Sequence, residues 1–93
     1  MREKLTNEQL RAYSEWARQC DNAYSRVISK EPKYRRLCRY RSLALAKAAR
    51  LEASGASPAV VRAILAKANR ASRLKIAHER ARLHEMGLLP FDG

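Results

Sequence analysis

The sequence is poor in residues that interrupt helices. Only three glycines and three prolines occur among its 93 residues, and Ala, Arg, Leu, Glu and Lys, all good helix formers, dominate it. No apolar run approaches the roughly 18 residues of a membrane-spanning helix, and residues 1–10 lack the apolar core of a signal peptide. We therefore expect one all-α domain over residues 1–93, with no membrane span and a cytoplasmic location.

Cysteine and histidine are also scarce. Cys20 and Cys38 do not form a Cys-x-x-Cys pair, and both fall on apolar stripes, as small buried thiols in a reducing compartment do. Whether they pair depends on a Cα separation that the sequence does not give. His78 and His84 fall on different sides of a helix, because they are six residues apart. No metal site is predicted.

Groups for catalysis are lacking as well. The sequence contains no Ser or Cys nucleophile with a paired base, no carboxylate pair and no glycine-rich phosphate loop. We therefore predict neither enzymatic activity nor a bound cofactor.

Large apolar side chains are few, and 16 of the residues are alanine. A chain of this length buries only about 60 to 65% of its unfolded surface, and alanine adds little area to the core. The monomer should therefore be marginally stable, or should gain core by forming a homodimer or by binding a partner.

Positive charge is abundant and unevenly placed. Of the 20 Lys and Arg residues, 14 lie between Lys33 and Arg82, where the only acidic residues are Glu52 and Glu79, so that this stretch carries +12 and the remainder −1. Such a field attracts an oppositely charged partner, and nucleic acid is the commonest polyanion. Arginine outnumbers lysine 14 to 6, which favours bidentate and stacked recognition of nucleic acid or of a protein surface.

The first helix is predicted over residues 7–29. Thr6 and Gln9 have the spacing of a capping box, and Leu5 and Leu10 stand at hydrophobic-staple positions. Its apolar face comprises Leu10, Tyr13, Trp16, Ala17, Cys20, Ala23, Tyr24, Val27 and Ile28.

Two further helices are predicted over residues 33–53 and 58–86. Pro32 ends the first helix and starts the second, and Gly55 followed by Ser57-Pro58 separates the second from the third. The apolar stripe of the second comprises Tyr34, Leu37, Ala44, Leu45, Ala48 and Leu51. On the third, Val61, Ile64, Leu65, Ala68, Leu83 and Met86 share one face, whereas Leu74, Ala77 and Ala81 drift to another.

That drift has two interpretations. The third helix is either one rod buried on two sides or two helices that meet near Asn69. Gly87 is placed to cap it, and the apolar tail over residues 88–93 either folds back onto the helices or anchors a partner. Short loops between helices of these lengths predict a three-helix bundle, or an extended antiparallel hairpin with a third helix.

Residues 55–65, Gly-Ala-Ser-Pro-Ala-Val-Val-Arg-Ala-Ile-Leu, resemble the turn and recognition-helix start of helix-turn-helix repressors of the LacI type. The resemblance covers 11 residues and implies that Ala59, Val60 and Arg62 face the major groove of DNA. The preceding helix departs from the motif, because Leu51 stands where such motifs keep a small residue.

The residues predicted to bind phosphate, with two tyrosines able to stack on bases, gather on the second and third helices. They are Tyr34, Arg35, Arg36, Arg39, Tyr40, Lys47, Arg50, Arg62, Arg70 and Arg73. The sequence thus predicts a small regulatory protein that binds DNA or RNA. The alternative is a protein-interaction module or inhibitor, such as a mobile-element-encoded regulator, that docks on an acidic protein surface through Leu43 or Phe91 as apolar anchors.

Overall fold

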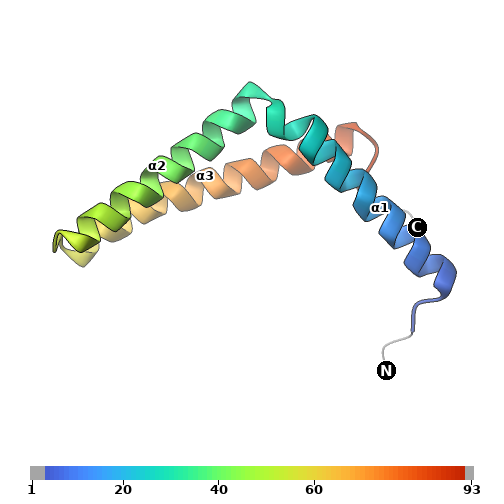
Figure 1. The fold of residues 1–93 in the computed structure, drawn as a ribbon, viewed down its shortest axis with the longest axis horizontal. Helices are drawn as coiled ribbons and strands as arrows, with labels where there is room; N and C mark the ends of the chain where they lie inside the picture. The colour runs from blue at the N-terminus through green and yellow to red at the C-terminus, as the bar shows by residue number, and fades with distance from the viewer. Residues whose placement is uncertain (1–3, 92–93) are drawn as a thin grey trace.

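The computed structural model describes residues 4–91, and over that range the chain is helical with no strand. Three α-helices follow one another, α1 (Asn7–Arg26), α2 (Pro32–Ala53) and α3 (Pro58–Glu85), with the short 3-10 helix η1 (Ile28–Lys30) after α1. Figure 1 shows α2 and α3 side by side as an antiparallel hairpin, with α1 leaving at an angle, so that the chain forms a V. The prediction of an all-α hairpin with a third helix is confirmed.

Local capping signals set most helix boundaries. The Thr6 hydroxyl accepts a hydrogen bond from the Gln9 amide at 3.1 Å, and the Gln9 side chain accepts one from the Thr6 amide at 2.8 Å, which completes the capping box. Gly55 and Gly87 follow α2 and α3 with φ of 82° and 76°, where glycine has no steric penalty. The next amides bond back to Leu51 and Leu83, as in a Schellman stop.

The first helix ends earlier than predicted. Val27 leaves the helical region with φ of −121° and ψ of −66°, and the chain continues as η1 rather than as α-helix to residue 29. This turn carries Ile28 inward, where its side chain is fully buried at the elbow of the V. The amides of Lys30 and Glu31 keep hydrogen bonds in η1, and the burial of Ile28 contributes about 1.5–3 kcal/mol.

The hairpin is held by a seam of residues that recur alternately every three and four positions. This is the 3.5-residue period of a coiled coil, and it runs unbroken through α3. Of the two interpretations of the third helix, the single rod is confirmed and the break near Asn69 is not. The rod is not buried on two sides, because Leu74, Ala77 and Ala81 are exposed. The buried and half-buried seam residues are Tyr34, Leu37, Arg41, Ala44, Ala48 and Leu51 on α2, and Val61, Ile64, Ala68, Ala71, Lys75, His78 and Arg82 on α3.

The centre of the seam is made of alanine. Ala44, Ala48, Ala68 and Ala71 are buried, and the only other buried residues in the described range are Ile28 and Tyr34. Leu45, which the sequence placed on the apolar stripe of α2, is 36% exposed. Small methyl groups let two helices approach closely but remove little apolar area from water. The expectation of a thin core is confirmed.

The molecule is extended and flat. It measures 55 × 38 × 16 Å with a radius of gyration of 18.4 Å, whereas a compact chain of this length has about 12 Å. Its accessible surface is 7564 Å², against about 5,500 Å² for a typical folded monomer of the same mass. The chain therefore leaves far more surface unpartnered than its size requires.

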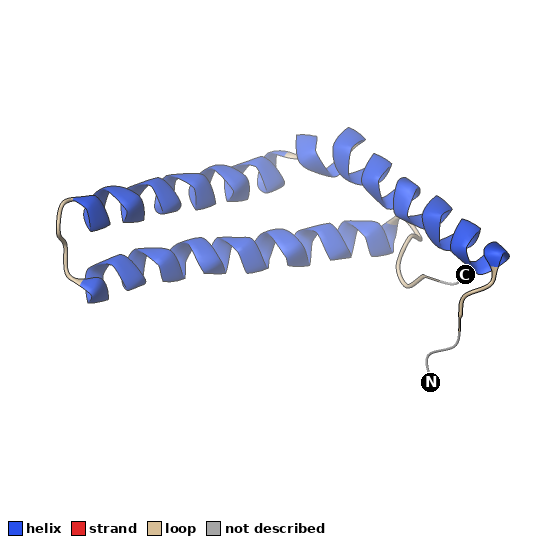
Figure 2. Cartoon of the chain, turned by 60° about the horizontal axis from the view of Figure 1, so that its bottom comes forward, coloured by secondary structure: helices blue, strands red, loops and turns tan. Residues whose placement is uncertain are grey.

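The C-terminal segment folds back onto α1. The Trp16 indole nitrogen donates a hydrogen bond to the Leu88 carbonyl, and the Phe91 ring lies 4.9 Å from the Trp16 ring and 5.7 Å from the Tyr13 ring, centroid to centroid. Figure 2 shows this segment passing beside α1 after the end of α3. The prediction that the apolar tail folds back is confirmed for residues 88–91, and residues 92–93 lie outside the described range.

The arrangement of α2 and α3 differs from a helix-turn-helix. In that motif the two helices cross at about 90–120°, whereas here they run antiparallel along the full length of α2. Gly55 serves as a Schellman stop within a hairpin loop. The resemblance of residues 55–65 to LacI-type repressors therefore reflects a shared way to stop one helix and start the next.

Candidate binding surfaces of the helical hairpin

The hairpin carries a dense set of exposed positive charges. Of the 14 basic residues between Lys33 and Arg82, only Arg41, Lys75 and Arg82 are half-buried, and the other eleven are exposed. Within the described range, none of those eleven forms an ion pair with a carboxylate. The surface therefore presents uncompensated positive charge along both helices.

The three half-buried basic side chains have internal partners. Arg41 donates from Nε to the Ser72 hydroxyl at 2.7 Å across the seam. The Lys75 ammonium lies 5.4 Å from the centroid of the Tyr34 ring, within range of a cation–π contact. Arg82 pairs with Glu31 and with Glu85. These cations stabilise the hairpin and are not free to hold a ligand.

The exposed arginines do not share one face. Arg39 and Arg73 lie two residues from seam residues on either side, which at about 100° per residue turns them away from the seam. They mark the outer edges of the hairpin. The basic residues that the sequence placed on the second and third helices therefore lie on several faces, and only some of them stand beside the same groove.

One face of the hairpin is hollowed into a continuous groove, which we call the hairpin groove. It consists of three adjoining hollows, in which Tyr40 and Lys67 link the first to the second, and Leu37 and Leu74 link the second to the third. The lining residues are Lys33, Leu37, Tyr40, Leu43, Ala44, Lys47, Ile64, Lys67, Arg70, Ala71, Leu74, Ala77, His78 and Ala81.

The groove combines an apolar floor with a basic rim. Leu43 is 60% exposed, Tyr40 51% and Leu74 49%, so large apolar side chains remain in contact with water. Four lysines and arginines line the groove with them, and none of the Asp and Glu residues within positions 4–91 does. Leu74 also belongs to the second apolar face that the sequence placed on the third helix, and that face forms one wall of the groove.

The predicted binding residues are divided by this geometry. Tyr40, Lys47, Arg70 and the predicted anchor Leu43 line the groove. The remaining arginines are exposed but lie outside its lining, namely Arg35, Arg36, Arg39, Arg50, Arg62 and Arg73.

The structure corrects the stacking role of Tyr34 and places Phe91 against α1. Tyr34 is 2% exposed and part of the core, because its position at the end of the seam turns its ring inward, so that it cannot stack on a base. Phe91 packs on Trp16 and is 38% exposed, so most of its ring is already used within the chain.

Sequence reasoning missed Lys33 and Lys67 as groove residues. Their signal was the seven-residue spacing of Lys33, Tyr40 and Lys47 on one helix and of Lys67, Leu74 and Ala81 on the other. Seven residues are two turns of a coiled-coil helix, so each set of three lines one wall.

A polar cluster fills the elbow where α1 meets the hairpin. The Glu31 carboxylate lies 3.2 Å from His78 Nε2 and 3.0 Å from Arg82 Nε. Desolvation alone would raise the pKa of Glu31, but the hydrogen bonds from His78 and Arg82 outweigh it, so that its pKa is lowered. Local sequence patterns do not indicate this cluster, because Glu31 and His78 are 47 residues apart.

Tyr34 closes the same elbow. Its hydroxyl donates to the Glu79 carboxylate and lies 3.0 Å from the Tyr24 hydroxyl. Burial, followed by the hydrogen bond to Glu79, raises the pKa of Tyr34, so the phenol stays protonated. Glu79 thus satisfies a buried hydroxyl, and the carboxylates of this region are engaged in structural contacts.

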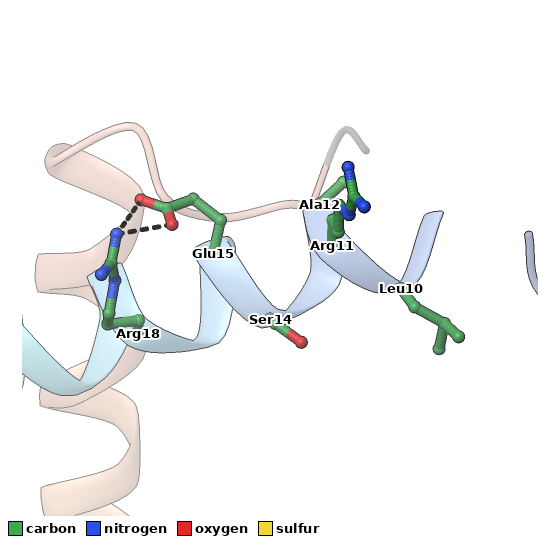
Figure 3. A pocket seen from close by; sticks show the side chains of 6 residues that line it. All are labelled: Leu10, Arg11, Ala12, Ser14, Glu15 and Arg18. Atoms are coloured by element: carbon green, nitrogen blue, oxygen red, sulfur yellow. Dashed lines mark hydrogen bonds and ion pairs between the residues drawn. The ribbon is translucent and has the colours of Figure 1, made fainter. Parts of the chain in front are cut away.

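A separate hollow lies on the outer side of α1, lined by Leu10, Arg11, Ala12, Ser14, Glu15 and Arg18. Figure 3 shows Arg18 and Glu15 turned toward one another and Leu10 pointing elsewhere. Their ion pair, at 2.6 Å, is solvent-exposed on both sides. The hollow is an open stretch of helix surface and gathers no group that points to a ligand.

Other kinds of site receive no support within residues 4–91. That range contains no group of three His, Cys, Asp or Glu side chains that could hold a metal ion. Cys20 and Cys38 are free thiols, both half-buried, and burial raises the pKa of Cys20. None of the helices described is both long enough and apolar enough to cross a membrane.

Comparison with known proteins adds no family to this description. No protein-family model matches the chain, and neither the curated proteins nor the solved structures give a significant match.

Proposed function

We propose that this protein is a small, non-enzymatic nucleic-acid-binding protein that holds the phosphate backbone with the α2–α3 hairpin. The observation that carries the proposal is the set of eleven exposed basic side chains on the hairpin, none of them paired with a carboxylate in the described range. Neutralisation of phosphates by such side chains releases condensed counterions, which supplies most of the affinity of non-specific binding.

The dimensions of the hairpin fit this role. With 22 residues, α2 is about 33 Å long, close to the roughly 34 Å of one turn of a DNA duplex. Arg39 and Arg73 project from the outer edges of the hairpin, and Tyr40 is exposed and able to stack on an unpaired base. Phosphate contacts position a protein without reading bases, so we expect binding to differ little among sequences.

A second candidate function is a protein-interaction module or inhibitor. The hairpin groove favours this function, because Leu43 lies 60% exposed beside basic neighbours and binding to phosphate does not explain an exposed leucine there. Exposed apolar side chains among positive charges are typical of a surface that another protein covers.

The nucleic-acid proposal is tested by titrating labelled double-stranded DNA, single-stranded DNA and RNA with the full chain at several salt concentrations. Binding should persist at about 0.15 M salt, with a steep dependence on salt. Replacing Arg39 and Arg73 with alanine should weaken binding and lower the salt slope by about one unit for each phosphate that is no longer neutralised.

The matched control for that variant is Arg18→Ala. Arg18 is an exposed arginine on α1 that is already paired with Glu15. The Arg18→Ala variant should bind nucleic acid with the same affinity and the same salt slope as the parent protein. Absence of binding at about 0.15 M salt, or equal effects of the hairpin and α1 variants, would reject the proposal.

A further inference from the structure

The hairpin groove lies where a third helix would pack in a three-helix bundle. Two helices of a coiled coil leave a furrow on each side of their seam, and a third helix that enters such a furrow makes a three-helix bundle. Here the furrow extends along α3 from Ile64 to Ala81, about 26 Å at 1.5 Å per residue. No residue of α1 or of the C-terminal segment lines it.

We propose that this groove binds an acidic amphipathic helix of another protein. The inference extends the second candidate function and is independent of nucleic-acid binding. The apolar lining, with Leu37, Leu43 and Leu74, would receive the apolar stripe of that helix, in the helix-in-groove mode of recognition. The rim would meet its flanking carboxylates.

The positive charge of the groove rim determines the charge that the partner must carry. Lys33, Lys47, Lys67 and Arg70 line the groove, and no carboxylate from the described part of the chain stands among the lining residues to balance them. Like charges opposite this rim would be repelled, whereas Glu or Asp beside the apolar stripe of a docked helix would be attracted. Acidic residues flanking an apolar stripe are therefore the feature that this surface selects.

A second copy of this chain fits less well. Two grooves face to face would bring together two identical basic rims. The helix outside the hairpin that a second copy could offer is α1, whose three acidic residues, Glu8, Glu15 and Asp21, are balanced by Arg11, Arg18 and Arg26. Charge complementarity thus favours a different, acidic protein.

The chain as a whole has more spare surface than a typical interface buries on one partner. The chain exposes about 2,000 Å² more than a compact monomer of its mass, and a typical protein interface buries about 800 Å² on each partner. A helix of about 17 residues matches the length of the groove. Because the groove already exists between two packed helices, little rearrangement opposes binding.

The test uses the full chain and a labelled synthetic peptide of about 18 residues, long enough to span the groove, with leucine at coiled-coil spacing and glutamate beside it. One comparison peptide keeps the composition but scrambles the leucine spacing, and another replaces glutamate with lysine. Fluorescence anisotropy at about 0.15 M salt should give a micromolar dissociation constant for the acidic amphipathic peptide, and values about tenfold or more weaker for the other two.

Two substitutions with the same charge change locate the site. Leu74→Glu places a carboxylate in the groove, whereas Ile76→Glu places one on the opposite side of α3, where the starting side chain is equally exposed (49% for Leu74, 52% for Ile76). Leu74→Glu should weaken peptide binding about tenfold or more, and Ile76→Glu by less than about twofold. Leu43→Glu, at a residue still more exposed, gives a second groove variant should Leu74→Glu lose helix content.

Several results would overturn the proposal. The acidic amphipathic peptide could fail to bind. The scrambled peptide could bind as tightly as the acidic amphipathic peptide, or Ile76→Glu could weaken peptide binding as much as Leu74→Glu does. Light scattering could instead reveal a dimer of the free chain that Leu74→Glu dissociates, which would assign the groove to a second copy. Loss of nucleic-acid binding in Leu74→Glu but not in Ile76→Glu would assign it to nucleic acid, whereas equal nucleic-acid binding by both keeps the two functions separate.

Discussion

The indole of Trp16 and the main-chain carbonyl of Leu88 are joined by a hydrogen bond that spans 72 residues and ties α1 to the segment after α3. The Phe91 ring packs on the same indole. This contact, together with η1, keeps α1 at its angle to the hairpin, because α1 has no buried residue of its own.

Phe91→Ala should release the tail from α1. Trp16 is the only tryptophan, so its fluorescence emission should shift to longer wavelength as the indole becomes hydrated. The stability of the fold should fall by about 1 kcal/mol because the aromatic packing is removed. Phe91→Leu, which retains apolar bulk, should shift the emission less, and an unchanged spectrum in Phe91→Ala would show that the tail does not cover Trp16 in solution.

Ala48→Leu should destabilise the hairpin because Ala48 is 3% exposed in the centre of the seam. Added methylene groups there force the two helices apart, at a cost of about 1–3 kcal/mol. Ala46→Leu, on the exposed side of the same helix, is the matched control and should be nearly neutral. Urea denaturation followed by circular dichroism measures both, and equal stabilities would contradict the close seam.

Stability should fall in acid through Glu31. Its pKa is lowered in the fold, so its contribution is present above the unfolded value of about 4.3 and is lost as the pH falls through the folded value. Glu31→Gln should therefore lower the melting temperature at pH near 7, and the difference from the parent should shrink below a pH of about 4.

The control for Glu31→Gln is Glu52→Gln. Glu52 is exposed near the end of α2 and forms no ion pair in the described range. The Glu52→Gln substitution should change the melting temperature little at any pH. A difference between Glu31→Gln and the parent that persists unchanged into acid would mean that the carboxylate charge is not what stabilises the elbow.

Gly55→Ala should weaken the turn between α2 and α3. Its φ of 82° costs an L-residue about 1 kcal/mol, although a Cβ there would meet no atom within 4 Å. A chain made by chemical ligation with D-alanine at residue 55 should show no such loss, because a D-residue favours positive φ. Melting temperatures compare the two, and equal destabilisation by both enantiomers would point to steric crowding in place of backbone strain.

Features encoded over a few residues were predictable from the sequence. Thr6 with Gln9, Ser57 with Pro58, and Gly87 each define a helix end through contacts within one turn, so their spacing alone identifies them. The end of α1 was misplaced because Val27 leaves the helix to bury Ile28, and that gain depends on the hairpin.

Features that depend on the alignment of α2 with α3 were not predictable. The sequence placed Tyr34 both on the apolar stripe of the second helix and among the residues able to stack on bases, and only the first assignment holds, because the ring is buried and the hydroxyl donates to Glu79, which is 45 residues away. The hairpin groove likewise exists only once Tyr40 and Lys67 are brought together by the pairing of the helices. Of its lining, the sequence identified Tyr40, Leu43, Lys47 and Arg70 through their type. It missed Lys33 and Lys67, because their seven-residue spacing from other lining residues marks a wall only once the pairing of the helices is known.

Alanine methyls present nearly the same surface one heptad up or down a helix, so the middle of the seam discriminates poorly between alternative registers of α2 and α3. The polar pairs at one end do discriminate. A shift by seven residues would leave Arg41 without Ser72 and the Tyr34 hydroxyl without Glu79, and each unsatisfied group would cost about 1–3 kcal/mol. Those hydrogen-bonded pairs are satisfied in only one register of α2 against α3. They therefore specify the fold where the alanines of the seam do not.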